Sequence, residues 1–138
     1  MEEVKKQGTE SLFVPYKIAL KLKELGFDEP CFAIYGKSEG YLFKIHTDKF
    51  NTVDELHFIK APTYSQAFRW FRQEHGLYSH VRESYAFDNT LEFVTQINGS
   101  YVNHGIEDKP INRFETYEEA ELECLKKLIE IAKEQNVK

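Results

Sequence analysis

The stretch TYEEAELECLKKLIEIAKEQ, residues 116–135, decides the fold of this 138-residue sequence more clearly than any other part. Its apolar residues recur at spacings of three and four, which predicts a helix from residue 117 to about residue 134. The apolar seam consists of Tyr117, Ala120, Cys124, Leu128 and Ile131, and it is widened by Leu122, Leu125, Ile129 and Ala132. A helix with so broad an apolar surface is expected to pack on more than one side.

The first five letters of this stretch, TYEEA, have a near copy in TYSQA at residues 63–67. Both match the capping box, in which a Thr hydroxyl accepts a hydrogen bond from the third helical N–H. The Glu or Gln three residues later reaches back to the Thr N–H. We therefore predict a second helix from residue 64 to about residue 75, ended by Gly76. Because the sequences beyond the two copies diverge, the shared letters indicate similar helix starts and not an internal repeat.

The N-terminal part holds a polar segment and one more predicted helix. Residues 1–12 are mostly polar and lack the apolar region of a signal peptide, and we expect them to be disordered. The helix follows in VPYKIALKLKELGFDEP, where Pro15 suits the first helical position and Gly26 the left-handed stop. We expect residues 13–138 to form a single α+β domain, because a chain of this length is of the usual size for one core.

Two β-hairpins complete the predicted elements. Their strands are residues 31–36 with 41–46, joined by KSEG, and residues 78–87 with 91–97, joined by DNT. Two further segments have a less regular sequence pattern. We expect residues 47–60 to form a loop with a short strand near residues 55–59, and residues 98–113 to form a loop with one edge strand. The resulting order is α-β-β-α-β-β-α. It favours an α+β sandwich with a mainly antiparallel sheet and its helices packed on one face.

Composition and charge narrow the classes of function. The net charge of −5 lacks the overall positive footprint of a protein that binds duplex DNA or RNA. A local basic patch is still compatible with it. The content of 41% hydrophobic and 14% aromatic residues is typical of a globular fold. No apolar run approaches the length of a membrane span, so we expect a cytoplasmic protein with no membrane partner.

Motifs for catalysis or metal binding are not found in the sequence. Cys31 and Cys124 are far apart and form no CxxC pair, so we expect both to be small buried residues. The five histidines show neither HxH nor HExxH spacing, and we expect no metal and no other cofactor. His75 and His80 flank one turn and remain candidates for a binding role or for a general base. The sequence favours a protein that is not an enzyme.

The strongest candidate for a binding site surrounds the single Trp of the chain, Trp70. It lies off the apolar stripe of the second helix, with Arg69 and Arg72 beside it, and Lys60 and Tyr64 lie near the helix start. A partly exposed Trp flanked by Arg can stack on a base or anchor a protein partner. The favoured alternative is a Trp70 that packs under a neighbouring loop and leaves the arginines in solvent.

Two resemblances bear on function. The order helix, strands, helix from Thr63 onward resembles that of a double-stranded-RNA-binding domain. Such domains place a basic cluster at the start of the last helix, whereas this helix begins TYEEAELE, whose acids would repel phosphate. VPYKIALKLKELGFDEPCFAIYG and APTYSQAFRWFRQEHG, followed by the TYEEA helix, resemble a family of small uncharacterised proteins of Bacteroidota genomes, mobile elements and phages. The resemblance covers most of residues 14–131 and implies an intracellular accessory role, with no assigned activity.

Three functions follow from these observations. The leading hypothesis is a non-enzymatic accessory protein that binds a macromolecule through an aromatic and basic patch around Trp70. Its partner would be a protein, or a nucleic acid, which the net charge does not favour. The alternative is a small-ligand or nucleotide binder that uses Trp70, Tyr64 and the two arginines. An enzyme with His75 or His80 as general base is the third. The broad apolar face of the last helix suits a monomer or a homodimer.

Overall fold

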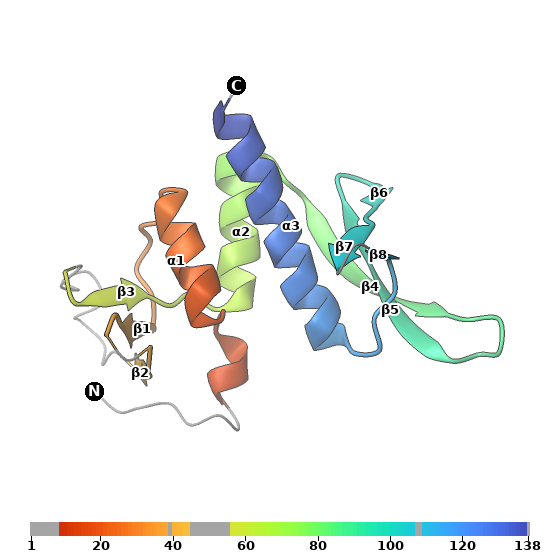
Figure 1. Ribbon diagram of the computed structural model, residues 1–138, viewed down its shortest axis with the longest axis horizontal. Coiled ribbons are helices and arrows are strands. Elements are labelled where there is room, and N and C mark those ends of the chain that lie inside the picture. Colours follow the sequence, from red (N-terminus) through yellow and green to blue (C-terminus); the bar gives the residue numbers. More distant parts are fainter. Residues whose placement is uncertain (1–8, 39, 45–55, 107–108, 138) are drawn as a thin grey trace. The chain divides into compact units, whose positions relative to one another are not determined.

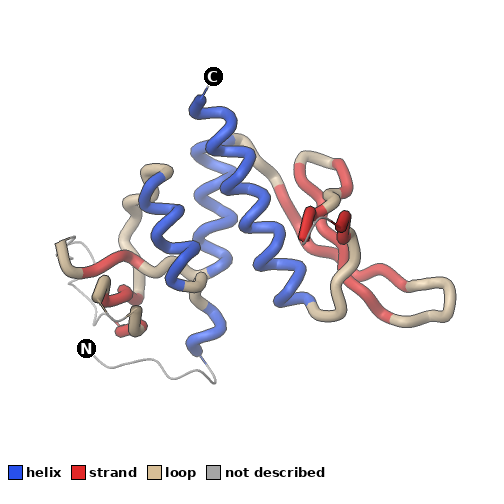
Figure 2. Tube along the Cα trace, in the orientation of Figure 1, coloured by secondary structure: helices blue, strands red, loops and turns tan. Residues whose placement is uncertain are grey.

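The computed structural model describes residues 9–38, 40–44, 56–106 and 109–137. It divides into two compact units, Met1–Ala67 and Phe68–Lys138, and the boundary falls within helix α2. Each unit contains a three-stranded antiparallel sheet. The predicted α+β class is confirmed (Figures 1 and 2). The predicted extent of the domain stays a prediction, and the two units are described separately below.

The first unit begins with a 3-10 helix, Thr9–Leu12, so the last residues of the segment expected to be disordered are helical. Residues 1–8 of that segment lie outside the described residues. Helix α1 follows at Tyr16–Glu24, with Pro15 as its N-cap, and therefore starts one residue later than predicted. Its end is the one expected: Gly26 has a φ of 105°, and the N–H of Phe27 donates to the carbonyl of Leu22.

The sheet of the first unit has the strand order β2-β1-β3. Strands β1, Ala33–Gly36, and β2, Leu42–Lys44, form the predicted hairpin. Strand β3, Phe58–Lys60, is antiparallel to β1 and lies at the end of the segment in which a short strand was expected. Residues 47–55 of that segment lie outside the described residues. Helix α1 packs beside β3 (Figure 1).

Helix α2, Tyr64–His75, has the predicted bounds, and Gly76 with a φ of 65° follows it. Half of its capping box is present, because the N–H of Gln66 donates to the Thr63 hydroxyl over 3.1 Å. The other half is not as predicted. The side-chain amide of Gln66 donates instead to the carbonyl of Pro30, 2.8 Å away. The cap thereby also ties the helix start to the segment before β1.

Helix α3, Tyr117–Val137, is the longest element of the second unit. The N–H of Glu119 donates to the Thr116 hydroxyl over 3.1 Å, and the Glu119 carboxylate accepts from that hydroxyl over 3.3 Å. Six of the nine residues predicted for the apolar face of α3 are buried: Ala120, Cys124, Leu125, Leu128, Ile129 and Ala132. Of the other three, Tyr117 is exposed, and Leu122 and Ile131 are half-buried. The six buried side chains are already covered within a single chain.

The sheet of the second unit has the order β4-β5-β6, with β4 at Ser79–Tyr85, β5 at Leu91–Ile97 and β6 at Ser100–Tyr101. The predicted β4–β5 hairpin is confirmed, and its tip projects beyond the N-terminal end of α3 (Figure 2). A separate pair, β7 at His104–Ile106 and β8 at Lys109–Ile111, follows β6. Helix α3 packs along β4 and β5 (Figure 1).

The predicted element order is therefore incomplete. It omits β7 and β8, and it includes β3 and β6 only as short strands without a predicted pairing partner. It also assumes one sheet, whereas the structure has separate sheets. These four strands have only two or three residues each, which is too few for an alternation of apolar and polar side chains to be visible. None of the described helices is both long enough and apolar enough for a membrane crossing.

Candidate functional site

Trp70, the centre of the predicted site, is a core residue with 5% of its surface exposed. Its ring centroid lies 5.1 Å from that of Phe71 and 4.9 Å from that of His75, both in edge-to-face geometry. Because the adjacent residues 70 and 71 are both buried, α2 is covered over a broad face and not along one stripe. The hypothesis of an exposed patch around Trp70 is therefore wrong.

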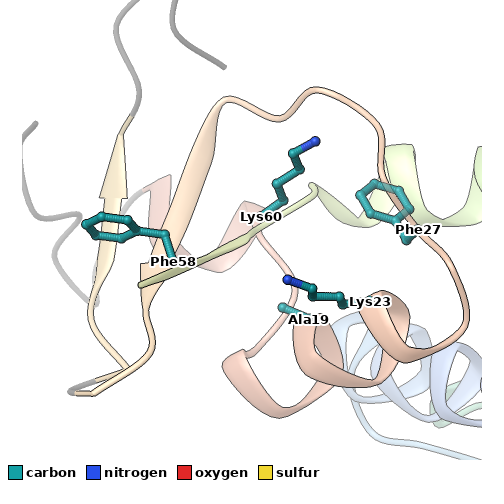
Figure 3. A pocket seen from close by; sticks show the side chains of 5 residues that line it. All are labelled: Ala19, Lys23, Phe27, Phe58 and Lys60. Carbon is teal, nitrogen blue, oxygen red and sulfur yellow. The ribbon is translucent and has the colours of Figure 1, made fainter. Parts of the chain in front are cut away.

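Two other predicted residues, Lys60 and Tyr64, belong to the first unit. Lys60 lies on β3, and its Nζ donates to Asp28 Oδ1 over 2.9 Å. It also lines a small cavity with Ala19, Lys23, Phe27 and Phe58 (Figure 3). The cavity volume of about 10 Å³ has room for about one water molecule and not for a nucleotide. Tyr64 is half-buried at the first position of α2.

The remaining predicted residues belong to the second unit. Arg69 and Arg72 are exposed on α2. His75 is half-buried and held against Trp70, while His80 is exposed on β4 and hydrogen-bonds the side chain of Gln96. Among the interactions that the structure describes, neither histidine meets a carboxylate or a thiol, which a general base would use as its partner. His80 lies on a surface with further exposed aromatic and basic groups, Tyr78, Arg82 and Tyr101.

That surface is one face of the β4–β5–β6 sheet. The other face packs on α3: Ser79 hydrogen-bonds the Cys124 thiol, and the ring of Phe93 lies 5.8 Å from that of Tyr117. Phe93 lies opposite Glu83 in the register, so Ser79 and Glu83 are on the side of α3. Since side chains alternate along a strand, His80 and Arg82 point away from α3. The sheet therefore has one face that α3 covers and one face that α3 leaves open, although Val94 on the second face is buried.

We call the second of these the open sheet face. The register of β4, β5 and β6 assigns most of its residues, Tyr78 is added because it continues the alternation of β4 by one residue, and Arg113 is added by its hydrogen bonds. Its residues are Tyr78, His80, Arg82 and Ser84 along β4, Glu92, Val94 and Gln96 along β5, Tyr101 on β6, and Arg113. Tyr78 precedes β4 and is held by Asn98, whose side chain accepts from its N–H over 2.9 Å. Arg113 belongs to the face because its Nη1 donates to Ser84 Oγ, 3.0 Å away, and to Glu92 Oε1, 3.4 Å away.

The open sheet face combines aromatic rings, guanidinium groups and polar hydrogen-bonding groups. Tyr78 and Tyr101 are each 62% exposed. Arg82 Nη1 donates to the Tyr101 hydroxyl over 3.4 Å, which places a positive charge beside that ring. His80 and Gln96 lie between the two tyrosines in the register and carry donors and acceptors. Such a surface can stack on flat ligands, neutralise anions and read polar edges.

On the covered face, a buried polar pair joins β5 to the segment after β6. Thr95 Oγ1 and His104 Nε2 are 2.7 Å apart, and the His104 ring lies 5.3 Å from that of Phe114. Burial lowers the pKa of His104, and the Lys127 charge adds to this, while Glu123 and Glu130 oppose it. The imidazole is therefore neutral at pH 7, as a structural hydrogen-bonding group would be.

Both cysteines are buried and free, as predicted. Burial raises the pKa of Cys31 to about 12 and that of Cys124 to about 11. Since the thiolate is the nucleophilic form, neither thiol is activated for catalysis at neutral pH.

A groove of the second unit lies beside α3 and β6. It is lined by Leu77, Ile97, Asn98, Ser100, Tyr101, Val102, Asn103, Lys127, Ile131 and Gln135, and its volume is about 500 Å³. Sites for small ligands usually have volumes of roughly 300–1,000 Å³, with an apolar lining and a few polar groups. The volume of the groove lies in this range, although polar residues make up more than half of its lining. None of the residues predicted for ligand binding lines it.

The sequence held a partial signal for the open sheet face. In YSHVRES, residues 78–84, every second residue is Tyr, His, Arg and Ser, but Ser79 and Glu83 between them are polar as well, so the sequence marks this side of the strand only weakly. Tyr101 and Arg113 could not be added to it, because they come from segments without visible periodicity. Their place depends on the pairing of β6 with β5 and on the hydrogen bonds of Arg113.

The fold and this site define a class: an α+β protein with an open, aromatic and basic sheet face. No protein-family model, curated protein or solved structure matches the chain. The likeness to Bacteroidota and phage proteins therefore stays an expectation from the sequence. Among the described residues, no three His, Cys, Asp or Glu side chains gather in a way that could hold a metal ion.

Proposed function

We propose that this protein is a binding module that recognises another macromolecule through the open sheet face. The observation that carries the proposal is the exposure of Tyr78 and Tyr101, 62% each, on the same face as Arg82 and Arg113. Tyr and Arg are the residues most often found at the energetic centres of macromolecular interfaces. The proposal keeps the kind of function that the sequence suggested and moves it from Trp70 to the sheet.

A capture experiment tests the proposal. The full-length protein is immobilised and incubated with a bacterial extract, and the bound material is divided between nuclease and protease treatment. We expect the double variant Arg82→Ala/Tyr101→Ala to lose most of the captured material, because both side chains are exposed and contribute contacts without supporting the core. Tyr41→Ala, which removes an exposed tyrosine from the first unit, is the matched control and should capture as the unmodified protein does.

The proposal fails if the double variant captures the same material in the same amount as the unmodified protein. A further variant locates the site if that occurs. Phe87 is fully exposed near the tip of the β4–β5 hairpin, with Tyr85 and Leu91 exposed nearby. Capture that is lost in Phe87→Ala and kept in the double variant would place the binding surface at the hairpin tip.

A second candidate function is the binding of a small ligand in the groove beside α3 and β6. Its volume of about 500 Å³ is the observation in its favour. Native mass spectrometry of gently purified protein should then show a retained small mass. The variant Ile131→Trp, which fills the groove from α3, should lack that mass. A retained mass that is unchanged in Ile131→Trp would contradict ligand binding in this groove.

A further inference from the structure

We infer that the macromolecule bound by the open sheet face is a single-stranded nucleic acid; this inference rests on the proposed function. The face offers together what such a ligand needs: aromatic planes for unstacked bases, cations for the backbone, and polar groups for the base edges.

The aromatic planes come from Tyr78 and Tyr101. Both rings are exposed on a sheet, whose strands hold successive side chains of one face about 7 Å apart and roughly perpendicular to it. Tyr101 lies opposite Gln96, and Gln96 lies opposite His80, so one row of the register crosses all three strands. Two bases could stack on the tyrosines, with the His80 and Gln96 side chains between them available to the base edges.

The cations come from Arg82 and Arg113. Arg82 extends to the hydroxyl of Tyr101, so a positive charge lies at the edge of that ring. The carboxylate of the face, Glu92, is 3.4 Å from the Arg113 guanidinium and is compensated by it. The face is therefore positive although the whole chain has a net charge of −5. This local charge complements a phosphate backbone.

Single strands fit the face better than duplexes do. A duplex hides the planes of its bases, so exposed tyrosines would gain nothing from it. Tyr and Arg also suit a protein interface, so a protein partner is the alternative outcome of the test below.

Fluorescence anisotropy with labelled oligonucleotides tests the inference. The probes are oligo-uridine and oligo-thymidine of about 12 nucleotides and a duplex of the same length, with full-length protein in low salt. We expect Tyr101→Ala to weaken single-strand binding at least about fivefold, which corresponds to the lower limit for one lost stacking contact. Tyr101→Phe keeps the ring and should bind nearly as the unmodified protein. Tyr41→Ala is again the control.

The salt dependence of the binding constant gives a second readout. It would not change in Arg82→Ala if Arg82 only supported the structure. For single strands, log K falls with log salt by about 0.7 for each neutralised phosphate. Arg82→Ala should therefore lower this slope by about 0.7, and Tyr101→Phe should leave it unchanged. Unchanged melting temperatures of all variants are required, since each altered side chain is exposed.

The outcomes separate the inference from the proposed function. Binding of the uridine probe, the thymidine probe or both supports the inference. The probe that binds more tightly shows whether the face prefers RNA or DNA. Equal binding of the duplex, or equal affinities of Tyr101→Ala and Tyr101→Phe, overturns it, as does no binding of any single strand. The proposed function can hold even then, with a protein as the partner. In that case the material captured by the unmodified protein is destroyed by protease and not by nuclease, and Arg82→Ala/Tyr101→Ala fails to capture it.

Discussion

Trp70 places its indole edge-to-face against two rings of its own helix, Phe71 and His75. A side chain of this size, with 5% of its surface exposed, is held by contacts on almost every side. At the scale of single residues, Trp70 therefore contributes to stability and not to recognition.

Replacing Trp70 by Ala should lower the free energy of unfolding by about 3–5 kcal/mol, because the change removes buried apolar surface and leaves a cavity. Urea denaturation measures this. Tyr101→Ala, at an exposed aromatic position, should stay within about 0.5 kcal/mol of the unmodified protein. An unfolding free energy that is unchanged in Trp70→Ala would contradict the burial and restore an exposed Trp as a binding candidate.

His104 makes stability depend on pH. In the unfolded chain its pKa is close to the ordinary value of about 6.5, and burial lowers it in the folded protein. The unfolded state therefore binds more protons as the pH falls through this value, and stability decreases from about pH 7.5 toward pH 5.5. The measurement is the unfolding free energy in urea at several pH values.

The variant His104→Gln isolates this contribution, because an amide can still hydrogen-bond Thr95 but does not titrate in this range. We expect the stability of His104→Gln to vary less with pH than that of the unmodified protein. Asn103→Ala, at an exposed position next to His104 that does not titrate, is the control and should keep the full pH dependence. An equally steep dependence in His104→Gln would assign the effect to other groups.

At the scale of elements, helices α2 and α3 begin with the same capping chemistry. Thr63 and Thr116 each accept a hydrogen bond from the N–H three residues later, over 3.1 Å in both cases. Their acidic or amide partners differ: Gln66 reaches the Pro30 carbonyl, whereas Glu119 stays with Thr116. The shared sequence pattern thus predicts the cap made by the Thr hydroxyl. It does not predict which group the Gln66 or Glu119 side chain contacts.

Removal of the α3 cap in Thr116→Ala should cost about 1 kcal/mol of unfolding free energy, because an N–H of the first turn loses its acceptor. Thr116→Ser keeps an equivalent hydroxyl and should recover nearly all of this loss. Denaturation curves of the two variants, measured side by side, give the comparison. If Thr116→Ser is as unstable as Thr116→Ala, the Thr methyl group and not the hydroxyl is what stabilises this end.

The whole molecule holds one free thiol in each compact unit, Cys31 in the first and Cys124 in the second. Both are buried, and their pKa values are raised to about 12 and about 11. A thiol reagent at about pH 8 should therefore react slowly with the folded protein and rapidly after unfolding.

The single-thiol variants Cys31→Ala and Cys124→Ala let each unit report its own unfolding. The sequence predicts one domain, and α2 begins in the first unit and continues into the second. We therefore expect both thiols to become reactive over the same range of urea concentration. If one thiol reacts at a clearly lower concentration than the other, the chain consists of two domains that unfold separately.

The sequence alone determined the features that depend on local chemistry. Helices α2 and α3, their Thr caps, the Gly26 and Gly76 stops and the two hairpins, β1–β2 and β4–β5, follow from periodicity and from residues with special backbone preferences. These signals lie within a few residues of one another. They can therefore be found without any knowledge of the distant parts of the chain.

Only the tertiary structure decided the surfaces. Whether Trp70 is exposed depends on what covers α2, and whether Tyr101 joins Arg82 depends on the pairing of a two-residue strand with β5. Strands this short show no periodicity, and burial is a property of neighbours that lie far away in the sequence. The fold class could therefore be predicted from the sequence, while the candidate binding face emerged only from the packing of the sheet on α3.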